Sequence, residues 1–403
     1  MKGSNIIVGL DVGTTKICAV VGELENDDLK IIGVSTSDST GLRKGVVVDI
    51  ESTVGSIKNA IETAESLTGV QINAVNIGIA GGHIKGFNSY GAIGIKGKEV
   101  TYADIDRVVD SAKAVYVPLD REVLHVLPTG YILDGQNGIK DPVGMMGVRL
   151  EAHVYIVTGA VTSVQNLLKC CEKVGLEVVD IVFEPLASAE AILTEEEREL
   201  GVAVVDIGGG TTDVILYKDG WLRHTSVLAV GGNHFTNDIA VGLRVTVSEA
   251  ERIKKSHGVA TTSLVNDAEE IAIIQAGNER KILRKYLSEI IEPRTEELLD
   301  LIKRELMSCS GYDIASTGLV LTGGGSLLKG LDKMAEAFLG LPVRIGTPRY
   351  VTGGKDLINN PMYSTGVGLV LYGMESESRK GFYPDMFTGI FGKMTGWVKG
   401  IFR

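Results

Sequence analysis

Several features that mark common protein classes are scarce in this sequence of 403 residues. The four cysteines include no Cys-x-x-Cys pair, which disfavours a disulfide framework and a zinc site and indicates a reducing compartment. Aromatic residues make up only 5% of the chain, so an aromatic-lined binding platform is not expected. Asp and Glu (51) outnumber Lys and Arg (40), and a net charge of −11 argues against nucleic acid as a partner.

Long apolar runs and several catalytic motifs are also missing. No stretch of 18 apolar residues occurs, and Asp11 comes before any apolar signal-peptide core could form, so no spanning helix or secretion signal is predicted. The six histidines show no paired metal-binding spacing, and the GxSxG and GxxxxGK[ST] patterns do not occur. These absences argue against a zinc hydrolase, a serine hydrolase and a P-loop NTPase.

The residues that are present form a repeated α/β pattern. A first cycle of three strand-like runs, a helix at 51–69 and a further strand precedes a second cycle, which opens at residue 201 and closes with a helix at 326–340. Each cycle contains an aspartate at a strand end followed by Gly and Thr, at residues 11–16 and 206–213. The sequence therefore predicts two related halves that face each other.

Two long segments interrupt these halves, and a tail follows them. The predicted units are a first half (1–83 and 159–197), an inserted subdomain (84–158), a second half (198–232 and 308–374), a second inserted subdomain (233–307), a polar linker (375–381) and a tail (382–403). In the first insertion we expect a helix at 102–116 and strands at 122–133 and 148–157. The second insertion is charged and predicted to be helical, including the stretch 279–307, where Pro293 would kink or start a helix.

The two aspartate turns have the composition of phosphate-binding loops. Glycine lets backbone N–H groups point at phosphate oxygens, and threonine adds donors. A carboxylate repels phosphate, so Asp11 and Asp206 are predicted to hold one Mg²⁺ through its water shell while Lys16 neutralises phosphate charge. Each turn alone could be an ordinary hairpin, but the pair, with a third glycine-rich turn at 321–326, favours a nucleotide site. The predicted nucleotide-binding residues of the three turns are Asp11, Gly13, Thr14, Thr15, Lys16, Asp206, Gly208, Gly209, Gly210, Thr211, Thr212, Gly323, Gly324, Gly325 and Ser326.

These motifs resemble those of the actin-like ATPase superfamily. The matching segments are two phosphate loops (11–16 and 206–213), two connecting helices (183–188 and 363–368) and an adenosine loop (321–330). The resemblance implies two ribonuclease H-like halves with ATP and Mg²⁺ as cofactors, and adenosine contacts from Glu251 and Lys254. It also implies a catalytic role for Glu184 in positioning water, with at most slow ATP hydrolysis, although a helix N-terminal Glu is also a common dipole and capping choice.

The first insertion is similar to a subdomain peculiar to the FtsA family of bacterial cell-division proteins. The matching segments are 82–89, 99–101, 120–126, 134–140 and 147–152. Membership would imply a protein that polymerises at the division site on the inner face of the cytoplasmic membrane. It would tether the tubulin-like ring protein FtsZ and bind other division proteins, with filament contacts in the first insertion. A pilus-assembly ATPase and, on the same fold, a small-molecule kinase with Asp206 or a neighbouring residue as base are the alternatives.

In this family the second insertion captures the C-terminal peptide of FtsZ. Basic residues there would attract an acidic peptide. They are Arg252, Lys254, Lys255, Arg280, Lys281, Arg284 and Lys285.

The tail is predicted to be an amphipathic helix that lies in an anionic membrane surface as a peripheral anchor. Its apolar side would gather the membrane-contacting residues Phe387, Ile390, Phe391, Met394, Trp397, Val398, Ile401 and Phe402. Lysines and glycines would occupy the other side. A core-packing helix has the same pattern, but a terminal position after a polar linker favours the anchor.

Overall fold

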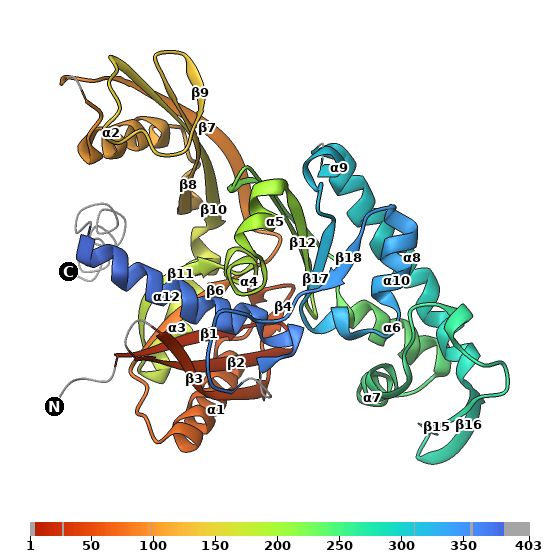
Figure 1. Cartoon of the computed structure of the whole chain (residues 1–403). Coiled ribbons are helices and arrows are strands. Elements are labelled where there is room, and N and C mark those ends of the chain that lie inside the picture. The colour runs from red at the N-terminus through yellow and green to blue at the C-terminus, as the bar shows by residue number, and fades with distance from the viewer. Residues whose placement is uncertain (1–4, 26–27, 98, 310, 355–357, 383–403) are drawn as a thin grey trace.

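The computed structural model describes residues 5–25, 28–97, 99–309, 311–354 and 358–382 (Figure 1). The predicted membrane tail, residues 383–403, lies outside this range. No helix of the described residues is both long and apolar enough to cross a membrane.

The first half is built on a five-stranded sheet. Its strands are β1 (Asn5–Val12), β2 (Lys16–Glu25), β3 (Asp28–Asp38), β6 (Ala74–Ile79) and β11 (Glu177–Phe183). β1, β2 and β3 form an antiparallel meander, and β6 and β11 continue the sheet parallel to β1, in the order β11-β6-β1-β2-β3. Helices α1 (Ile50–Thr68) and α3 (Val161–Val174) pack on one face of this sheet.

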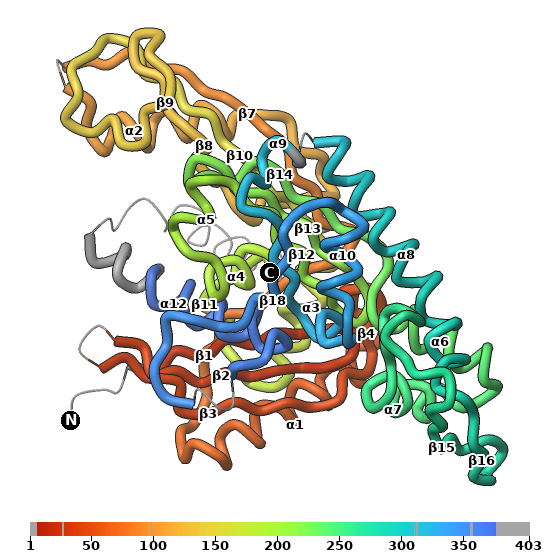
Figure 2. The backbone as a smooth tube through the Cα atoms, turned by 45° about the vertical axis from the view of Figure 1, so that its right-hand side comes forward, coloured from red at the N-terminus to blue at the C-terminus, as the bar shows by residue number. Residues whose placement is uncertain are grey.

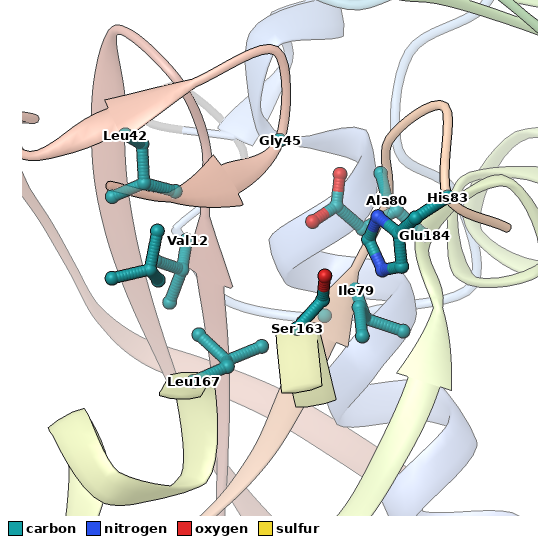
Figure 3. Close-up of a pocket in the computed structure, with 11 residues that line it drawn as sticks. Val12, Leu42, Gly45, Ile79, Ala80, His83, Ser163, Leu167 and Glu184 are labelled. Atoms are coloured by element: carbon teal, nitrogen blue, oxygen red, sulfur yellow. The ribbon is translucent and has the colours of Figure 1, made fainter. Parts of the chain in front are cut away.

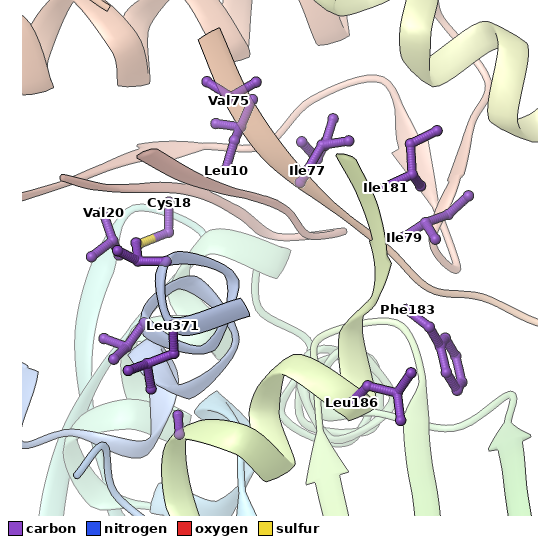
Figure 4. Close-up of a cluster of buried hydrophobic side chains, with 14 of the residues drawn as sticks. Leu10, Cys18, Val20, Val75, Ile77, Ile79, Ile181, Phe183, Leu186 and Leu371 are labelled. Atoms are coloured by element: carbon purple, nitrogen blue, oxygen red, sulfur yellow. The ribbon is translucent and has the colours of Figure 1, made fainter. Parts of the chain in front are cut away.

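Two further helices, α4 (Glu184–Ile192) and α12 (Ser364–Phe382), pack together on the other face. Figure 4 shows Val20 of β2 on the side of the sheet that faces Leu371 of α12, while Leu10 and Ile77 point to the opposite face; all four are buried. The C-terminal helix of the described chain therefore completes the core of the first half.

The second half repeats the topology of the first. Its strands are β12 (Val202–Ile207), β13 (Thr212–Lys218), β14 (Trp221–Leu228), β17 (Leu319–Thr322) and β18 (Val343–Ile345). Again three strands form an antiparallel meander and two continue in parallel, in the order β14-β13-β12-β17-β18. The predicted duplication is confirmed.

The inserted subdomain has its own sheet and core. Its elements are β7 (Lys85–Gly94), α2 (Tyr102–Lys113), β8 (Arg121–Leu133), β9 (Gln136–Ile139) and β10 (Arg149–Ala160). The four strands are antiparallel, in the order β7-β10-β8-β9, and α2 packs against β7 and β10. Figures 1 and 2 show this subdomain and the β15–β16 hairpin at opposite ends of the molecule.

The second insertion is less helical than predicted. Its elements are α6 (Gly232–Leu243), α7 (Val247–His257), the short η1 (Thr262–Leu264), β15 (Glu270–Gln275), β16 (Asn278–Leu283) and α8 (Arg284–Ser308). Residues 279–283 form a strand because Ala276 and Gly277, both with positive φ, make a hairpin turn before them. Pro293 lies inside α8, so the prediction that it might start a helix was wrong.

Shorter elements connect these units. They are β4 (Leu42–Arg43), β5 (Val46–Val47), α5 (Glu195–Leu200), α9 (Gly311–Ile314), η2 (Gly324–Leu327), α10 (Leu331–Leu339) and η3 (Pro361–Tyr363). The single helix predicted at 326–340 is interrupted at Gly330, which adopts a left-handed conformation (φ 81°). Residues 375–381, predicted to be a linker, continue α12 as helix.

Candidate functional site

The two aspartate turns lie against each other, one from each half. A Cβ atom added to Gly209 would come within 2.4 Å of Thr15 Cγ2, and one added to Gly210 within 2.7 Å of Thr14 Oγ1. Only glycine allows this approach. In the described part of the chain, the backbone N–H groups of these four residues donate no hydrogen bond to another residue. Unpaired donors from both halves therefore gather at one place, as an anion site requires.

The first turn carries a charged pair. Lys16 Nζ lies 3.2 Å from Asp11 Oδ2 and donates to the carbonyl oxygen of Met362 at 2.7 Å. Asp11 is 7% exposed at the end of β1. The turn itself is closed by a hydrogen bond from Gly13 N–H to the Lys16 carbonyl at 3.0 Å. This arrangement holds a cation and a carboxylate beside the free N–H groups.

The second turn places a buried carboxylate beside two hydroxyl side chains. Asp206 Oδ2 accepts a hydrogen bond from Ser188 Oγ at 2.6 Å, and Thr365 Oγ1 lies 3.5 Å away. Burial raises the pKa of Asp206 to about 6, against the opposing effect of the Ser188 hydrogen bond, and the nearby Asp11 raises it further. On the neighbouring strand, burial raises the pKa of Asp213, and its Oδ1 has no hydrogen-bond partner among the described residues.

Glu184 lies beside these carboxylates at the start of α4. Burial and then the charges of Asp11 and Asp213 raise the pKa of Glu184 well above its usual value. Its side chain packs against Gly78 of β6, where an added Cβ would lie 2.8 Å from Glu184 Cγ. The site thus concentrates negative charge in a buried place, which a divalent cation would neutralise.

The third glycine-rich turn closes over the second. An added Cβ on Gly323, whose φ is 79°, would come within 2.2 Å of Asp206 Oδ1, and one on Gly325 within 2.3 Å of Ile207 Cγ2. Ser326 is buried and donates to the Gly323 carbonyl at 2.7 Å, which fixes the turn rather than leaving the hydroxyl for a ligand.

The second insertion contributes two charged residues next to the second turn. Lys254 Nζ lies 2.6 Å from Glu251 Oε2 and donates to the Gly232 carbonyl at 3.0 Å. Gly232 in turn donates from its backbone N–H to the Gly208 carbonyl at 2.9 Å. Burial lowers the pKa of Lys254, although Glu251 opposes this. Lys254 is therefore linked to the second turn through Gly232, and Glu251 is linked to it through Lys254.

The donor set fits an ATP–Mg²⁺ complex. The free N–H groups and Lys16 suit phosphate oxygens, and Asp11 and Asp206 are the residues that would hold the water shell of a magnesium ion. Bound magnesium would supply charge neutralisation at the phosphates.

The sequence did not single out several residues that shape this site. Ser188 follows Glu184 by one helical turn, and Thr365 lies in the second connecting motif, so both were within recognised segments. Gly78 gave no signal, because its contact with Glu184 depends on the pairing of β6 with β11.

Most of the basic residues predicted to face a partner are already paired. Arg252 forms a two-pronged contact with Glu249, and Arg284 is bound to Glu269 and to the His257 carbonyl. The Arg284 side chain is only 14% exposed, so it holds the subdomain together and is poorly placed to receive a peptide. Lys255 and Lys281 have largely exposed side chains, although each also lies near a glutamate, and Arg280, also exposed, donates to Gln275.

Two family models match the chain. The model described as cell division protein FtsA matches residues 203–368, and the model described as the SHS2 domain inserted in FtsA matches residues 81–158.

Cell division proteins from several bacteria are similar over almost the whole chain. Cell division protein FtsA of Pseudomonas aeruginosa is 47% identical over 381 residues, which are 94% of this chain and 91% of that protein. The protein of the same name from Escherichia coli K12 is 42% identical over 383 residues, 92% of this chain and 91% of that protein. That from Bacillus subtilis 168 is 37% identical over 385 residues, 94% and 86% of the two chains.

Solved structures are similar in fold. A chain of a PilM–PilN type IV pilus biogenesis complex matches with a TM-score of 0.67 and 17% identity, covering 91% of this chain and 98% of that chain. MreB5 of Spiroplasma citri bound to ADP matches with a TM-score of 0.55 and 17% identity, covering 94% and 98%. At these identities the likeness shows an actin-like fold and nothing more.

Proposed function

Because this chain belongs to the FtsA family of cell division proteins, we propose that it binds ATP with Mg²⁺ between its two halves. In that state it polymerises on the inner face of the cytoplasmic membrane and tethers FtsZ there. The family places the chain in cell division. The nucleotide, filament, membrane and FtsZ steps are our proposal.

The observation that carries the nucleotide step is the contact between the two aspartate turns. Gly209 and Gly210 bring the second turn against Thr14 and Thr15 of the first, and all four leave their N–H groups unpaired in the described chain. A phosphate chain bound there would contact both halves at once, so binding would be linked to the relative position of the halves.

Asp206→Asn tests this step. The amide keeps the size of the side chain and can still accept from Ser188, but it lacks the negative charge that would hold the water shell of a magnesium ion. We expect Mg²⁺-dependent ATP binding, measured by calorimetry, to weaken by roughly 100-fold, as removal of a charged metal contact does. ATP-dependent sedimentation of filaments should be lost with it.

The matched control is Asp110→Asn, an exposed aspartate of α2 paired with Lys113. It should bind ATP as the wild type does. Unchanged ATP affinity in Asp206→Asn, with a native melting profile, would reject the site.

For FtsZ, the exposed cations of the second insertion support capture of an acidic peptide. Lys255 and Lys281 are 73% and 70% exposed at their side chains, and Arg280 lies on the same hairpin as Lys281. Reversing all three to Glu should weaken binding of the FtsZ C-terminal peptide and flatten its salt dependence, as measured by fluorescence anisotropy. Lys58→Glu on α1, 61% exposed, is the control; equal loss in both variants would mean that no specific face is involved.

We assign filament contacts to the inserted subdomain, where Tyr116 and Leu119 are 86% and 99% exposed. Apolar side chains so exposed suit a protein contact. Leu119→Asp should reduce ATP-dependent sedimentation without changing ATP affinity, and normal sedimentation would place the contact elsewhere.

A further inference from the structure

A small cavity lies inside the first half, next to the candidate nucleotide site. Its volume is about 10 Å³, close to the space that one water molecule needs. Most of its wall is aliphatic side chain or glycine, but Glu184, His83 and Ser163 also line it. Figure 3 shows these three side chains around the same space, from the start of α4, the loop after β6 and the first turn of α3.

No contact described so far accounts for the polar side chain of His83 in this wall. Both of its ring nitrogens are buried, and neither has a hydrogen-bond partner in the described part of the chain. Burial and the nearby Arg121 guanidinium lower the pKa of His83, so the ring is neutral near pH 7 and carries one donor and one acceptor. Buried groups of this kind nearly always bond to protein or to an ordered water.

The surrounding contacts hold His83 in place. Arg121 Nη2 donates to the His83 carbonyl at 2.9 Å and to the Thr158 carbonyl at 2.8 Å. Gly81, with φ 123°, allows the loop to pass Lys44, because an added Cβ would lie 2.9 Å from the Lys44 carbonyl oxygen and 3.2 Å from His83 Nδ1. These contacts fix the backbone of the loop at His83, whose ring lines the cavity.

We propose that this cavity binds one water molecule held jointly by Glu184, His83 and Ser163. Through this water, His83 acts as a positioning residue that orients the Glu184 carboxyl group for ATP hydrolysis. The role of His83 rests on the proposed function, because Glu184 acts only if ATP binds between the two turns.

The reaction that Glu184 would assist is a simple displacement. An attacking water, distinct from the cavity water, forms a bond to the γ-phosphorus. The bond from that phosphorus to the β–γ bridging oxygen breaks, ADP leaves with the electron pair, and the proton of the attacking water ends on inorganic phosphate. His83 touches neither the nucleotide nor the attacking water, so its loss should change kcat and leave the KM for ATP unchanged.

The experiment compares His83→Leu with His83→Asn in the full-length protein. Leucine fills a similar space but cannot bind water, whereas asparagine keeps a donor and an acceptor. We expect kcat to fall by about 10- to 100-fold in His83→Leu, the range seen when an outer partner of a reacting group is lost, and to recover largely in His83→Asn. Calorimetric ATP affinity should stay within about twofold in both variants.

The control is His153→Leu on β10, where the histidine is exposed; this variant should keep wild-type kcat. High-resolution crystal structures of the wild type and His83→Leu test the water directly, which should be present in the first and missing from the second. If His83→Leu does not fold, Ser163→Ala takes its place, with a smaller loss of kcat expected.

The possible results distinguish the proposed role of His83 from the proposed function of the protein. Wild-type kcat in His83→Leu, or a wild-type crystal structure without the cavity water, would overturn the inference. A wild type that binds ATP but does not hydrolyse it would overturn the role of His83. Failure of the wild type to bind ATP at all would instead reject the proposed function.

Discussion

His125 connects the inserted subdomain to the candidate site through a single buried hydrogen bond. Its Nε2 accepts from the backbone N–H of Phe183 at 2.9 Å, directly before Glu184. The imidazole is 6% exposed, and burial lowers the pKa of His125 to about 4. The acceptor nitrogen must be unprotonated for this bond, so the position of α4 depends on a neutral histidine.

This arrangement predicts a pH dependence of stability. In the unfolded chain His125 has its usual pKa near 6.5, so between about pH 6.5 and 4 the unfolded state binds more protons than the folded state. The contribution of neutral His125 is therefore complete above pH 6.5 and is lost as the pH falls towards 4. The shift corresponds to roughly 3 kcal/mol across that window.

His125→Gln isolates this effect, because an amide oxygen can still accept from Phe183 without titrating. Urea unfolding at pH 7.5 and pH 5 should show a smaller loss of stability in the variant than in the wild type. Asp206 titrates in the same range with the opposite sign, and comparing the two proteins removes its contribution. Parallel losses in both proteins would show that His125 does not titrate in this window.

At the scale of single residues, the sequence predicted which glycines and aspartates belong to the candidate site but not which residues contact them. Asp11, Asp206 and the glycines of the turns could be named because their types and spacing have a local meaning. Ser188 contacts Asp206 across the boundary between the halves, and the environment of His83 comes from three separate elements. Such contacts depend on tertiary packing, which local patterns do not encode.

Among the elements, α4 and α12 cross with their backbones in close contact. An added Cβ on Gly368 would come within 1.8 Å of the Ala187 carbonyl oxygen, so the α12 backbone lies directly on α4. Gly9 of β1 makes a similar contact, since its added Cβ would lie 2.5 Å from the Gly366 carbonyl oxygen. Glycine at these positions lets α12 pack against both the helix and the sheet.

Gly368→Ala should therefore destabilise the protein although alanine favours helices. The methyl group has no room, and such overpacking costs about 1–3 kcal/mol. Gly55→Ala in α1 is the control, because an added Cβ there meets nothing within 4 Å and should stabilise by up to about 1 kcal/mol. Thermal melting should move in opposite directions for the two variants; a stable Gly368→Ala would mean that the two helices separate easily.

Element types were predicted well where a strong local period ran without interruption. The helix predicted at 51–69 corresponds to α1, and the predicted strand 122–133 to β8. Errors arose where a local signal was overridden or overlooked. The turn at Ala276 and Gly277 creates a hairpin in a charged stretch, and the polar residues 375–381 continue α12 because the helix is already nucleated by its buried half.

The architecture of the whole molecule could be predicted because it is repeated. Two strand–turn–strand units with an aspartate at the turn indicated two related halves, and both sheets show the same order of meander and parallel strands. The segment between residues 84 and 158 was too long for a loop, and it forms a sheet with its own apolar core. How far the halves close on each other could not be predicted, since that depends on contacts such as Gly209 with Thr15.

The proposed attachment to the membrane belongs to the same scale, because it would set how the whole molecule is oriented. Residues 375–382 lengthen α12 by about 12 Å, so the tail begins at the end of a helix rather than after an irregular linker. From Arg379 onward the sequence has five Lys/Arg and one Asp, opposite in sign to the chain as a whole. Each cation near an anionic leaflet adds roughly 1 kcal/mol, and Trp397 would lie among the apolar side chains of the predicted helix.

Trp397→Glu should therefore release the protein from vesicles that contain anionic lipid, because it puts a charge into the apolar side and lowers the net positive charge of the tail. Trp397→Phe keeps an aromatic ring and should still bind, while ATP affinity should be the same in all three proteins. Co-sedimentation measures the difference, and neutral vesicles should hold even the wild type weakly. If Trp397→Glu sediments with anionic vesicles as completely as the wild type, another surface attaches the protein to lipid and the tail is not its anchor.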